Sequence, residues 1–394
     1  MYLVGLGHCG THWITATFLT ILPFVITDLG LSYTQAGFLI SVFHVSSAAA
    51  NLPSGIAVDV TGRRVVFQAV ALVLGAVGLI GFALVSAPLA LAGMVAIMGA
   101  TNMLWHPAAI SYLSLLYPAR RGYALSIHAL GANLGDAAAP LAAGAMLVAM
   151  SWHETAFFNA LPVLASAAVI FFLLKRSHAR QPAPHVHAGG VREYLRGMAQ
   201  LLRRRAIWLL CLLAGFRSMT QYGLLAFLPL YLSHDLKVNP FWMGFTLTML
   251  QVGGIVASPL AGALSDRVGR RPIVLAGLWA TTVIIFLLTF VTAVPIYVAG
   301  VSLLGFFMYA LRPVIHSWMM DMAPKELGAS VTSMVFGTQS GLATLMPIVG
   351  GALADRFGLI TVFYFLAASV LVANLLTLLV PKEDTRSAAP AKAA

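Results

Sequence analysis

Charged residues are scarce in this sequence. They make up 9% of its 394 residues, whereas soluble domains carry about 25%. So little charge cannot cover a water-facing surface, which excludes an ordinary soluble protein. Hydrophobic residues make up 60%, and long apolar stretches recur, for example at 69–92, 156–174 and 273–294. Each is near the roughly 20 residues that a helix needs to cross hydrocarbon, so the sequence predicts a polytopic α-helical protein in a lipid bilayer.

Cysteine is almost absent: Cys9 and Cys211 are the only two, and both lie inside apolar stretches. A disulfide framework and a cysteine-based metal site are therefore not expected. The chain also lacks the Gly-x4-Gly-Lys-Ser/Thr loop, so direct use of ATP is not expected. Residues 1–9 lack the basic region of a cleavable signal peptide, and the apolar stretch continues to Ile26. We expect no enzyme activity, no cofactor and no metal site.

Acidic residues are also few, with 12 against 23 lysines and arginines, which gives a formal net charge of +11. The basic residues lie in alternate loops, at Arg63, Arg64, Arg120, Arg121, 175–205, Arg267, Arg270, Arg271, Lys325 and from Lys382 onward. The loops between them hold only Lys237 and Arg356. This alternation indicates membrane topology and not a nucleic-acid partner. The positive-inside rule predicts a multi-pass protein of the cell inner (cytoplasmic) membrane with both termini cytoplasmic.

Apolar runs bounded by turn and charge signals predict twelve membrane-spanning helices. They are expected at 3–28, 34–58, 65–86, 88–116, 122–150, 154–175, 206–233, 240–264, 271–292, 295–321, 327–352 and 358–380. The segment 176–205 is rich in Arg, His, Pro and Gly, so it is predicted to be a cytoplasmic linker. It separates an N-terminal six-helix bundle, 1–175, from a C-terminal six-helix bundle, 206–382, and a cytoplasmic tail follows at 383–394.

The two halves repeat each other at a shift of 206 to 207 residues. Gly55, Asp59, Gly62, Arg63 and Arg64 recur as Gly262, Asp266, Gly269, Arg270 and Arg271. His106-Pro107 falls on Arg312-Pro313, and further matches continue to Gly144 and Gly350. A half-length repeat of six spans is typical of a two-fold transporter whose site lies between the halves near the midplane.

The spacing Gly-x3-Asp-x2-Gly-Arg-Arg, present at 55–64 and again at 262–271, resembles the signature loop of the major facilitator superfamily. In that family the loop locks the two halves in the outward-facing state. The resemblance therefore implies a conformational gating role for these ten residues. It also implies an all-α fold of two pseudo-symmetric bundles, the major facilitator fold, with the first, fourth, seventh and tenth helices lining a central cavity.

A narrower stretch, from Trp105-His106-Pro107 through Gly131-x-Asn133-x-Gly135 to Pro140, is similar to fosmidomycin-resistance-type efflux carriers. The segment Ala139-Pro140-x2-Ala143-Gly144 also resembles the fifth-span motif of antiporters in the superfamily. These resemblances imply export by antiport.

Six ionisable residues are predicted to lie near mid-depth: His12, His44, His106, Asp136, Arg217 and Arg312. A charge there costs at least ~2.5–3.5 kcal/mol, so such residues usually face a cavity or a partner and mark substrate or proton pathways. Two arginines against one carboxylate favour an anionic or strongly polar substrate. The substrate-binding candidates are Arg217, Arg312, His106, His12, Gln221, Asn102 and Tyr222.

Asp136 is the predicted proton carrier, together with His12 and His106, and a permanent salt bridge that holds the two halves together is the alternative for Asp136. The histidines have the alternative of neutral hydrogen-bonding groups between helices. Arg217 has the alternative of bonding backbone carbonyls or Gln221. For Arg312 the alternative is a salt bridge with Asp136 or with Asp321.

The sequence predicts a secondary active transporter that moves a small anionic or polar organic solute by alternating access. Proton-coupled export is the first choice of mechanism. Proton-coupled uptake of a small organic anion is the alternative, followed by a membrane-embedded sensor or enzyme. We expect a monomer whose partners are a small-molecule substrate, protons and lipid.

Overall fold

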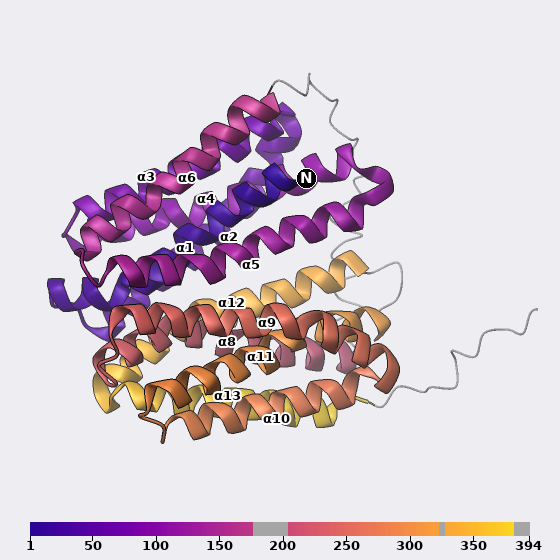
Figure 1. Ribbon diagram of the computed structural model, residues 1–394. Coiled ribbons are helices and arrows are strands. Elements are labelled where there is room, and N and C mark those ends of the chain that lie inside the picture. The colour runs from indigo at the N-terminus through magenta and orange to yellow at the C-terminus, as the bar shows by residue number, and fades with distance from the viewer. Residues whose placement is uncertain (176–203, 323–327, 382–394) are drawn as a thin grey trace, which may run out of the picture.

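The computed structural model describes residues 1–175, 204–322 and 328–381. Within these ranges all regular secondary structure is helical (Figure 1). The elements are α1 (Tyr2–Leu29), α2 (Tyr33–Thr61), α3 (Arg64–Leu84), α4 (Pro88–Leu116), η1 (Pro118–Arg120), α5 (Arg121–Met146), α6 (Trp152–Lys175), α8 (Arg205–His234), α9 (Pro240–Val268), α10 (Arg270–Leu288), α11 (Val294–Met322), α12 (Gly328–Phe357) and α13 (Leu359–Leu379). The predicted all-α fold is confirmed.

Ten of the described helices are long and apolar enough to cross a membrane. The two helices outside this set, α5 and α12, are of similar length but contain more glycine and polar residues. Most predicted helix bounds agree with the structure to within a few residues. The larger differences are at the ends predicted for 150, 264, 292 and 352, which lie at Met146, Val268, Leu288 and Phe357. Most of the predicted linker and the tail lie outside the described residues.

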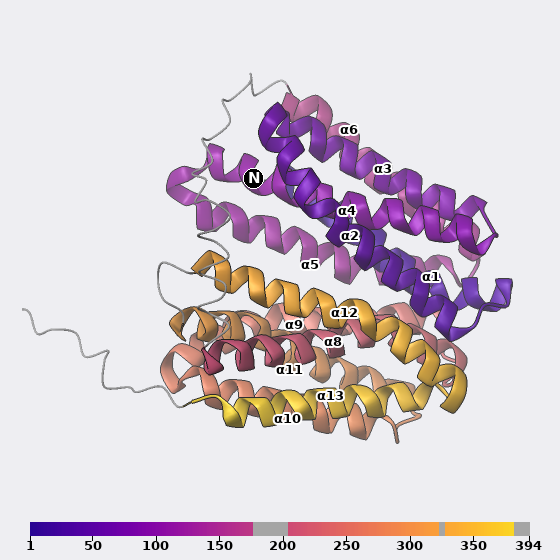
Figure 2. The ribbon, with the colours of Figure 1, turned by 180° about the vertical axis from the view of Figure 1, so that it is seen from behind.

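The packing repeats between the halves as the sequence does. In the N-terminal half α1 contacts α5, α2 contacts α4, and α3 contacts both α4 and α6. In the C-terminal half α8 contacts α12, α9 contacts α11, and α10 contacts both α11 and α13. Figures 1 and 2 show these two groups of six helices, one above the other. Each half therefore buries its own apolar side chains, and the halves meet along α2 with α12 and α5 with α9.

The two sides of the molecule differ in how closely the halves approach. We call the side with the α2–α3, α4–α5 and α9–α10 connections the termini face, and the opposite side the far face. Toward the far face, Ser41 Oγ of α2 donates to the Thr344 carbonyl of α12 at 2.8 Å. Thr248 Oγ1 of α9 likewise donates to the Ala137 carbonyl of α5 at 2.7 Å. The halves are joined there by direct helix contact.

Two equivalent glycines permit this contact. A Cβ at Gly37 would overlap the carbonyl of Pro347, and a Cβ at Gly244 would overlap the carbonyl of Pro140. Both pairs are related by the shift of 207 residues that relates the two halves. Only glycine has no Cβ, so these positions allow the backbones of opposite halves to touch. The two contacts form a pseudo-symmetric closure at the far face.

Further contacts across the halves lie at the far end of this closure. Asp355 of α12 accepts hydrogen bonds from the backbone N–H groups of Tyr33 and Thr34, at 2.8 and 2.9 Å, at the beginning of α2. His234 at the end of α8 bonds the Tyr33 hydroxyl at 3.1 Å and the Pro23 carbonyl of α1 at 3.2 Å. By contrast, a Cβ at Gly55 or its equivalent Gly262 would have nothing within 4 Å. The described contacts between the halves therefore gather at the far face, and Figure 1 shows the two groups of helices diverging toward the termini face.

Candidate functional site

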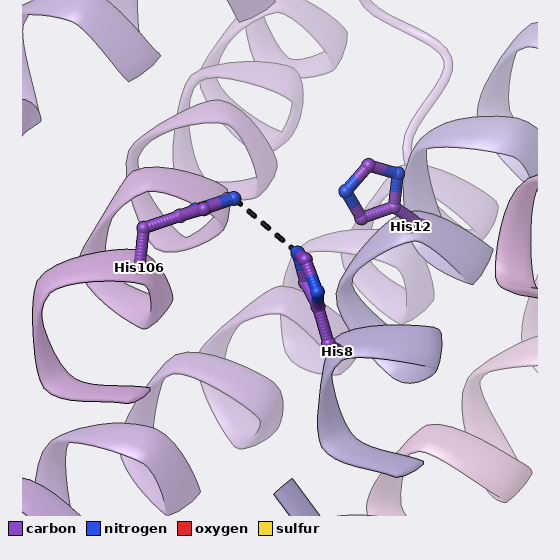
Figure 3. Close-up of side chains that lie close together, drawn as sticks. All are labelled: His8, His12 and His106. Carbon is purple, nitrogen blue, oxygen red and sulfur yellow. Dashed lines mark hydrogen bonds between the residues drawn. The ribbon is translucent and has the colours of Figure 1, made fainter. Parts of the chain in front are cut away.

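Four imidazole rings cluster in the N-terminal half. His8 and His12 lie one turn apart on α1, His106 lies on α4, and His128 lies on α5. The His8 and His128 rings stack at 3.7 Å between centroids and 8° between planes. The His8 and His106 rings meet edge to face at 5.1 Å. Figure 3 shows nitrogens of His8 and His106 facing each other, with one ring nitrogen of His12 turned toward them.

The rings of His8, His12 and His106 are each held by a hydrogen bond at Nδ1. His8 Nδ1 lies 2.7 Å from the carbonyl oxygen of His128, and His106 Nδ1 lies 2.8 Å from that of Asn102. His12 Nδ1 lies 3.0 Å from the Asp136 carboxylate of α5. The remaining nitrogens of His8 and His106, both Nε2, are 3.3 Å apart. The rings are fixed in orientation by α1, α4 and α5 together.

Asp136 pairs with His12, a partner that the sequence analysis did not assign to it. Both side chains are partly exposed, at 27% for His12 and 28% for Asp136. Both belong to the N-terminal half, so the pair does not join the two halves. Among the described residues, Arg312 forms no salt bridge with Asp136, and Asp321 pairs instead with Arg270 at 3.0 Å.

The two predicted arginines differ in their surroundings. Arg217 of α8 is buried, with 3% of its surface exposed. Its Nε and Nη2 donate to the Met308 carbonyl of α11 at 3.3 and 2.8 Å. The alternative of a backbone bond is therefore realised for Arg217. Arg312 of α11 is exposed, and it lies within electrostatic reach of Arg217 and of His106 in the other half. Its guanidinium is thus available to a ligand between the halves.

The other predicted site residues take various positions. Gln221 is buried one turn from Arg217, and Asn102 is half-buried. Tyr222 of α8 contacts His44 of α2 across the two halves, with ring centroids 4.9 Å apart. His8, which the sequence analysis did not place among the candidate site residues, lies at the centre of the imidazole cluster. Its one-turn spacing from His12 was the available signal.

The signature loops tie helices together within each half. Arg270 bonds Asp266 one turn earlier, the Ser265 hydroxyl at 2.7 Å and the Asp321 carboxylate of α11. In the first copy, Arg64 is buried and its Nε donates to the Ser111 hydroxyl of α4 at 3.2 Å. No hydrogen bond or ion pair described for these loops crosses between the halves. Their gating role therefore stays a prediction.

An apolar groove of about 370 Å³ lies elsewhere, between α3 and α6. It is lined only by aliphatic and aromatic side chains, among them the exposed residues Val70, Val73 and Leu74. Exposed apolar side chains on a membrane-spanning bundle suit contact with lipid tails. This groove lacks the polar groups of a solute site. The imidazole cluster, with Asp136 and Arg312 near it, is therefore the better candidate.

The sequence is similar to transporters along its whole length. YfnC of Bacillus subtilis, named as an uncharacterized MFS-type transporter, is 22% identical over 98% of this chain and 93% of its own. The probable sulfoacetate transporter SauU of Cupriavidus necator is 27% identical over 85% of this chain and 82% of its own. The multidrug resistance protein MdtG of Serratia proteamaculans is 30% identical, but over only 45% of this chain and 43% of its own.

Solved structures of transporters share the fold. A bacterial homologue of the human lysosomal transporter Spinster, in an inward-facing and unoccupied conformation, gives a TM-score of 0.81 at 15% identity. That alignment covers 96% of this chain and 95% of the other. A variant of the nucleoside transporter NupG gives 0.81 at 14% identity, covering 96% of this chain and 99% of the other. At these identities the likeness concerns the fold alone.

The Major Facilitator Superfamily model matches residues 4–245 and 210–394, which together span nearly the whole chain. The signature loops, the half-length repeat and the paired bundles agree with that match. The protein is thus a multi-pass membrane transporter and not an enzyme, and it belongs to the major facilitator superfamily.

Proposed function

We propose that this transporter exports a small anionic or polar organic solute in exchange for protons, by alternating access, at the cell inner membrane. The observation that carries the proposal is the unequal lining of the space between the halves. Histidines and Asp136 line the N-terminal side, and Arg312 lies on the C-terminal side.

The state of the molecule supports alternating access. The halves touch at the far face through the Gly37–Pro347 and Gly244–Pro140 contacts, and their helices diverge toward the termini face (Figure 1). Because the positive-inside rule predicts a cytoplasmic termini face, this state would receive substrate from the cytoplasm. Rocking of one half against the other would open the far face instead, as in transporters built from repeats. A transporter that binds its substrate from the cytoplasm and then opens at the far face would export it.

The chemistry of Arg312 supports an anionic substrate. Its guanidinium is exposed, and no described carboxylate lies within salt-bridge distance of it. A guanidinium grips carboxylate, sulfonate or phosphate groups through paired hydrogen bonds. A ligand with such a group would supply the missing counter-charge. The name of SauU, a probable sulfoacetate transporter, includes a small organic anion of this kind.

The Asp136–His12 pair supports proton coupling. It lies close to His106, on helices that line the same space as Arg312, and both partners are partly exposed. Protonation of the carboxylate would weaken its bond to His12, and the change of charge would be felt by an anion at Arg312. The names of MdtG and of the efflux pump PmrA of Streptococcus pneumoniae include drug resistance and efflux, which favours export as the direction.

The test is flux in proteoliposomes under an imposed pH gradient, with a panel of small organic anions that begins with sulfoacetate. We expect the gradient to drive uphill movement of a substrate, and we expect Asp136→Asn to abolish this coupling while leaving downhill exchange. Asp28→Asn is the matched control, because Asp28 also pairs with a histidine, His153, at 3.7 Å but at the far face. Undiminished coupling in the Asp136 variant would remove this carboxyl group from the mechanism.

The same measurement separates the two directions of coupling. Substrate flux opposed to the proton gradient supports antiport, whereas flux along it supports the alternative of uptake by symport. A protein that binds anions but moves none under any gradient would contradict the transport proposal as a whole.

A further inference from the structure

The hydrogen bonds of His8 and His106 determine which ring nitrogens carry hydrogen. A backbone carbonyl oxygen can only accept, so Nδ1 of His8 must donate to the His128 carbonyl and Nδ1 of His106 must donate to the Asn102 carbonyl. A neutral imidazole carries one N–H, so Nε2 of each ring holds a lone pair. The 3.3 Å contact between these two Nε2 atoms therefore brings two lone pairs together. Such a contact is stable only with a cation between them.

His12 completes the arrangement. Its Nδ1 is taken by the Asp136 carboxylate, so Nε2 is the nitrogen left to face the other two rings. Figure 3 shows a ring nitrogen of His12 turned toward His8 and His106. The ligand atoms of the three side chains all lie within 4.8 Å of one another. Three ring nitrogens with lone pairs therefore lie near one another between α1 and α4.

The distances fit a bound metal ion. Two nitrogens bonded to one tetrahedral Zn²⁺ at about 2.0–2.1 Å lie about 3.3–3.4 Å apart, because of the tetrahedral angle. The His8–His106 separation of 3.3 Å has this value. The His12 nitrogen is farther away, within 4.8 Å, so an ion would draw that ring inward.

The outer hydrogen bonds also fit. Metal-bound histidines almost always donate their other N–H to a carboxylate or a backbone carbonyl, which fixes the ring and makes it a better ligand. All three histidines have such a partner: two carbonyls and the Asp136 carboxylate. Asp136, His12 and the ion would form the carboxylate–histidine–metal arrangement.

We propose that His8, His12 and His106 bind one first-row transition-metal ion through their Nε2 atoms. Imidazole suits zinc, copper, nickel and iron, whereas magnesium and calcium prefer oxygen. Three protein ligands leave a fourth position for water or for an anionic group. Arg312 lies within reach of His106 and opposes a second cation, so an anion in that fourth position would help to balance the charge. The sequence alone predicts no such site, because only the fold brings His106 to the other two rings.

The test is titration of the purified protein with Zn²⁺ by calorimetry, and with Co²⁺ by absorption. Three linker histidines outside the described residues, His178, His185 and His187, are first replaced by glutamine, and no polyhistidine tag is used. We expect about one Zn²⁺ per chain and the strong visible absorption of tetrahedral Co²⁺. Absence of saturable binding of either ion to this otherwise native protein would overturn the proposal.

Variants locate the site. We expect His8→Gln and His106→Gln to weaken Zn²⁺ binding at least about tenfold, and Asp136→Asn to weaken it roughly 10–100-fold through His12. His153→Gln is the control, since His153 also bonds a carbonyl, that of Ala83, through Nδ1 but lies at the far face. Unchanged affinity in both ligand variants would also overturn the proposal.

If a variant fails to fold, the Co²⁺ spectrum of the parent still decides whether a tetrahedral nitrogen site exists. The metal titration measures neither transport direction nor proton coupling, so its failure leaves the proposed function to its own test.

Discussion

Arg217 and Arg312 carry the same charge but have different partners. Arg217 is buried and donates twice to the Met308 carbonyl, whereas Arg312 is exposed between the halves. A hydrogen bond from a charged group contributes about 1.5–3 kcal/mol, which corresponds to roughly 10–100-fold in binding. We therefore expect Arg312→Ala to weaken the binding of an anionic substrate by about that factor with little loss of stability. Binding calorimetry and thermal unfolding measure the two effects.

The comparison variant is Arg217→Ala. Removal of a buried cation that bridges α8 and α11 should lower the free energy of unfolding by about 1–3 kcal/mol, whatever its effect on the substrate. Equal loss of stability in the two variants would contradict the assignment of Arg312 to the ligand. So would unchanged anion affinity in Arg312→Ala.

The sequence identifies the chemistry-bearing residues better than their partners. His12, His106 and Asp136 could be placed near mid-depth because helix length and loop charge determine depth in a membrane. The pairing of His12 with Asp136 could not be placed, because the two residues are 124 positions apart and the choice depends on how α1 and α5 rotate against each other. The same holds for His8, whose neighbours come from α4 and α5.

At the scale of single elements, the beginning of α2 depends on a residue of the other half. Ser32 caps α2 locally, and Asp355 of α12 adds bonds to the N–H groups of Tyr33 and Thr34. A carboxylate at a helix N-terminus gains both hydrogen bonds and a favourable interaction with the helix dipole. We expect Asp355→Asn to raise the population open at the far face by about tenfold, for a loss of about 1.4 kcal/mol. Distances between spin labels on α2 and α12 would report this change.

Asp235→Asn is the control for that experiment. Asp235 is an exposed acid directly after α8, at the same face. We expect Asp235→Asn to leave the distances between the spin labels unchanged. An equal shift in both variants would mean that general charge at the far face, and not the cap on α2, sets the closure.

The elements themselves were the most predictable part of the molecule. Apolar runs long enough to span hydrocarbon indicated all twelve described helices, because lipid requires every backbone group to be bonded within the helix. The ends were less certain where polar residues continue a helix. Ser265, Asp266 and Arg267 lie beyond the apolar run but still belong to α9. The cap from Asp355 had no signal in the sequence, since it lies 322 positions from Tyr33.

At the scale of the whole molecule, the closure at the far face is built twice from the same parts. A methyl group at Gly37 would overlap Pro347, and one at Gly244 would overlap Pro140. We expect Gly37→Ala and Gly244→Ala each to disfavour the far-closed state and to slow transport by roughly tenfold or more, since overpacking costs about 1–3 kcal/mol. Transport rates and the accessibility of cysteines placed near the far face would measure the effect.

Gly93→Ala is the control for both substitutions. Gly93 lies on α4, where an added Cβ would have nothing within 4 Å, so transport should be unchanged. A large effect at only one of the two closure positions would show that the halves do not contribute equally to the gate.

The repeat also places His106 and Arg312 at equivalent positions on opposite walls, within reach of each other. The two halves therefore share a backbone arrangement but present different chemistry to the space between them. His106 presents a nitrogen lone pair on one side, and Arg312 presents a fixed positive charge on the other. A substrate with two chemically different ends would therefore bind between these residues in one orientation only. The difference between the two halves thus allows the transporter to distinguish one end of its substrate from the other, which two identical halves could not do.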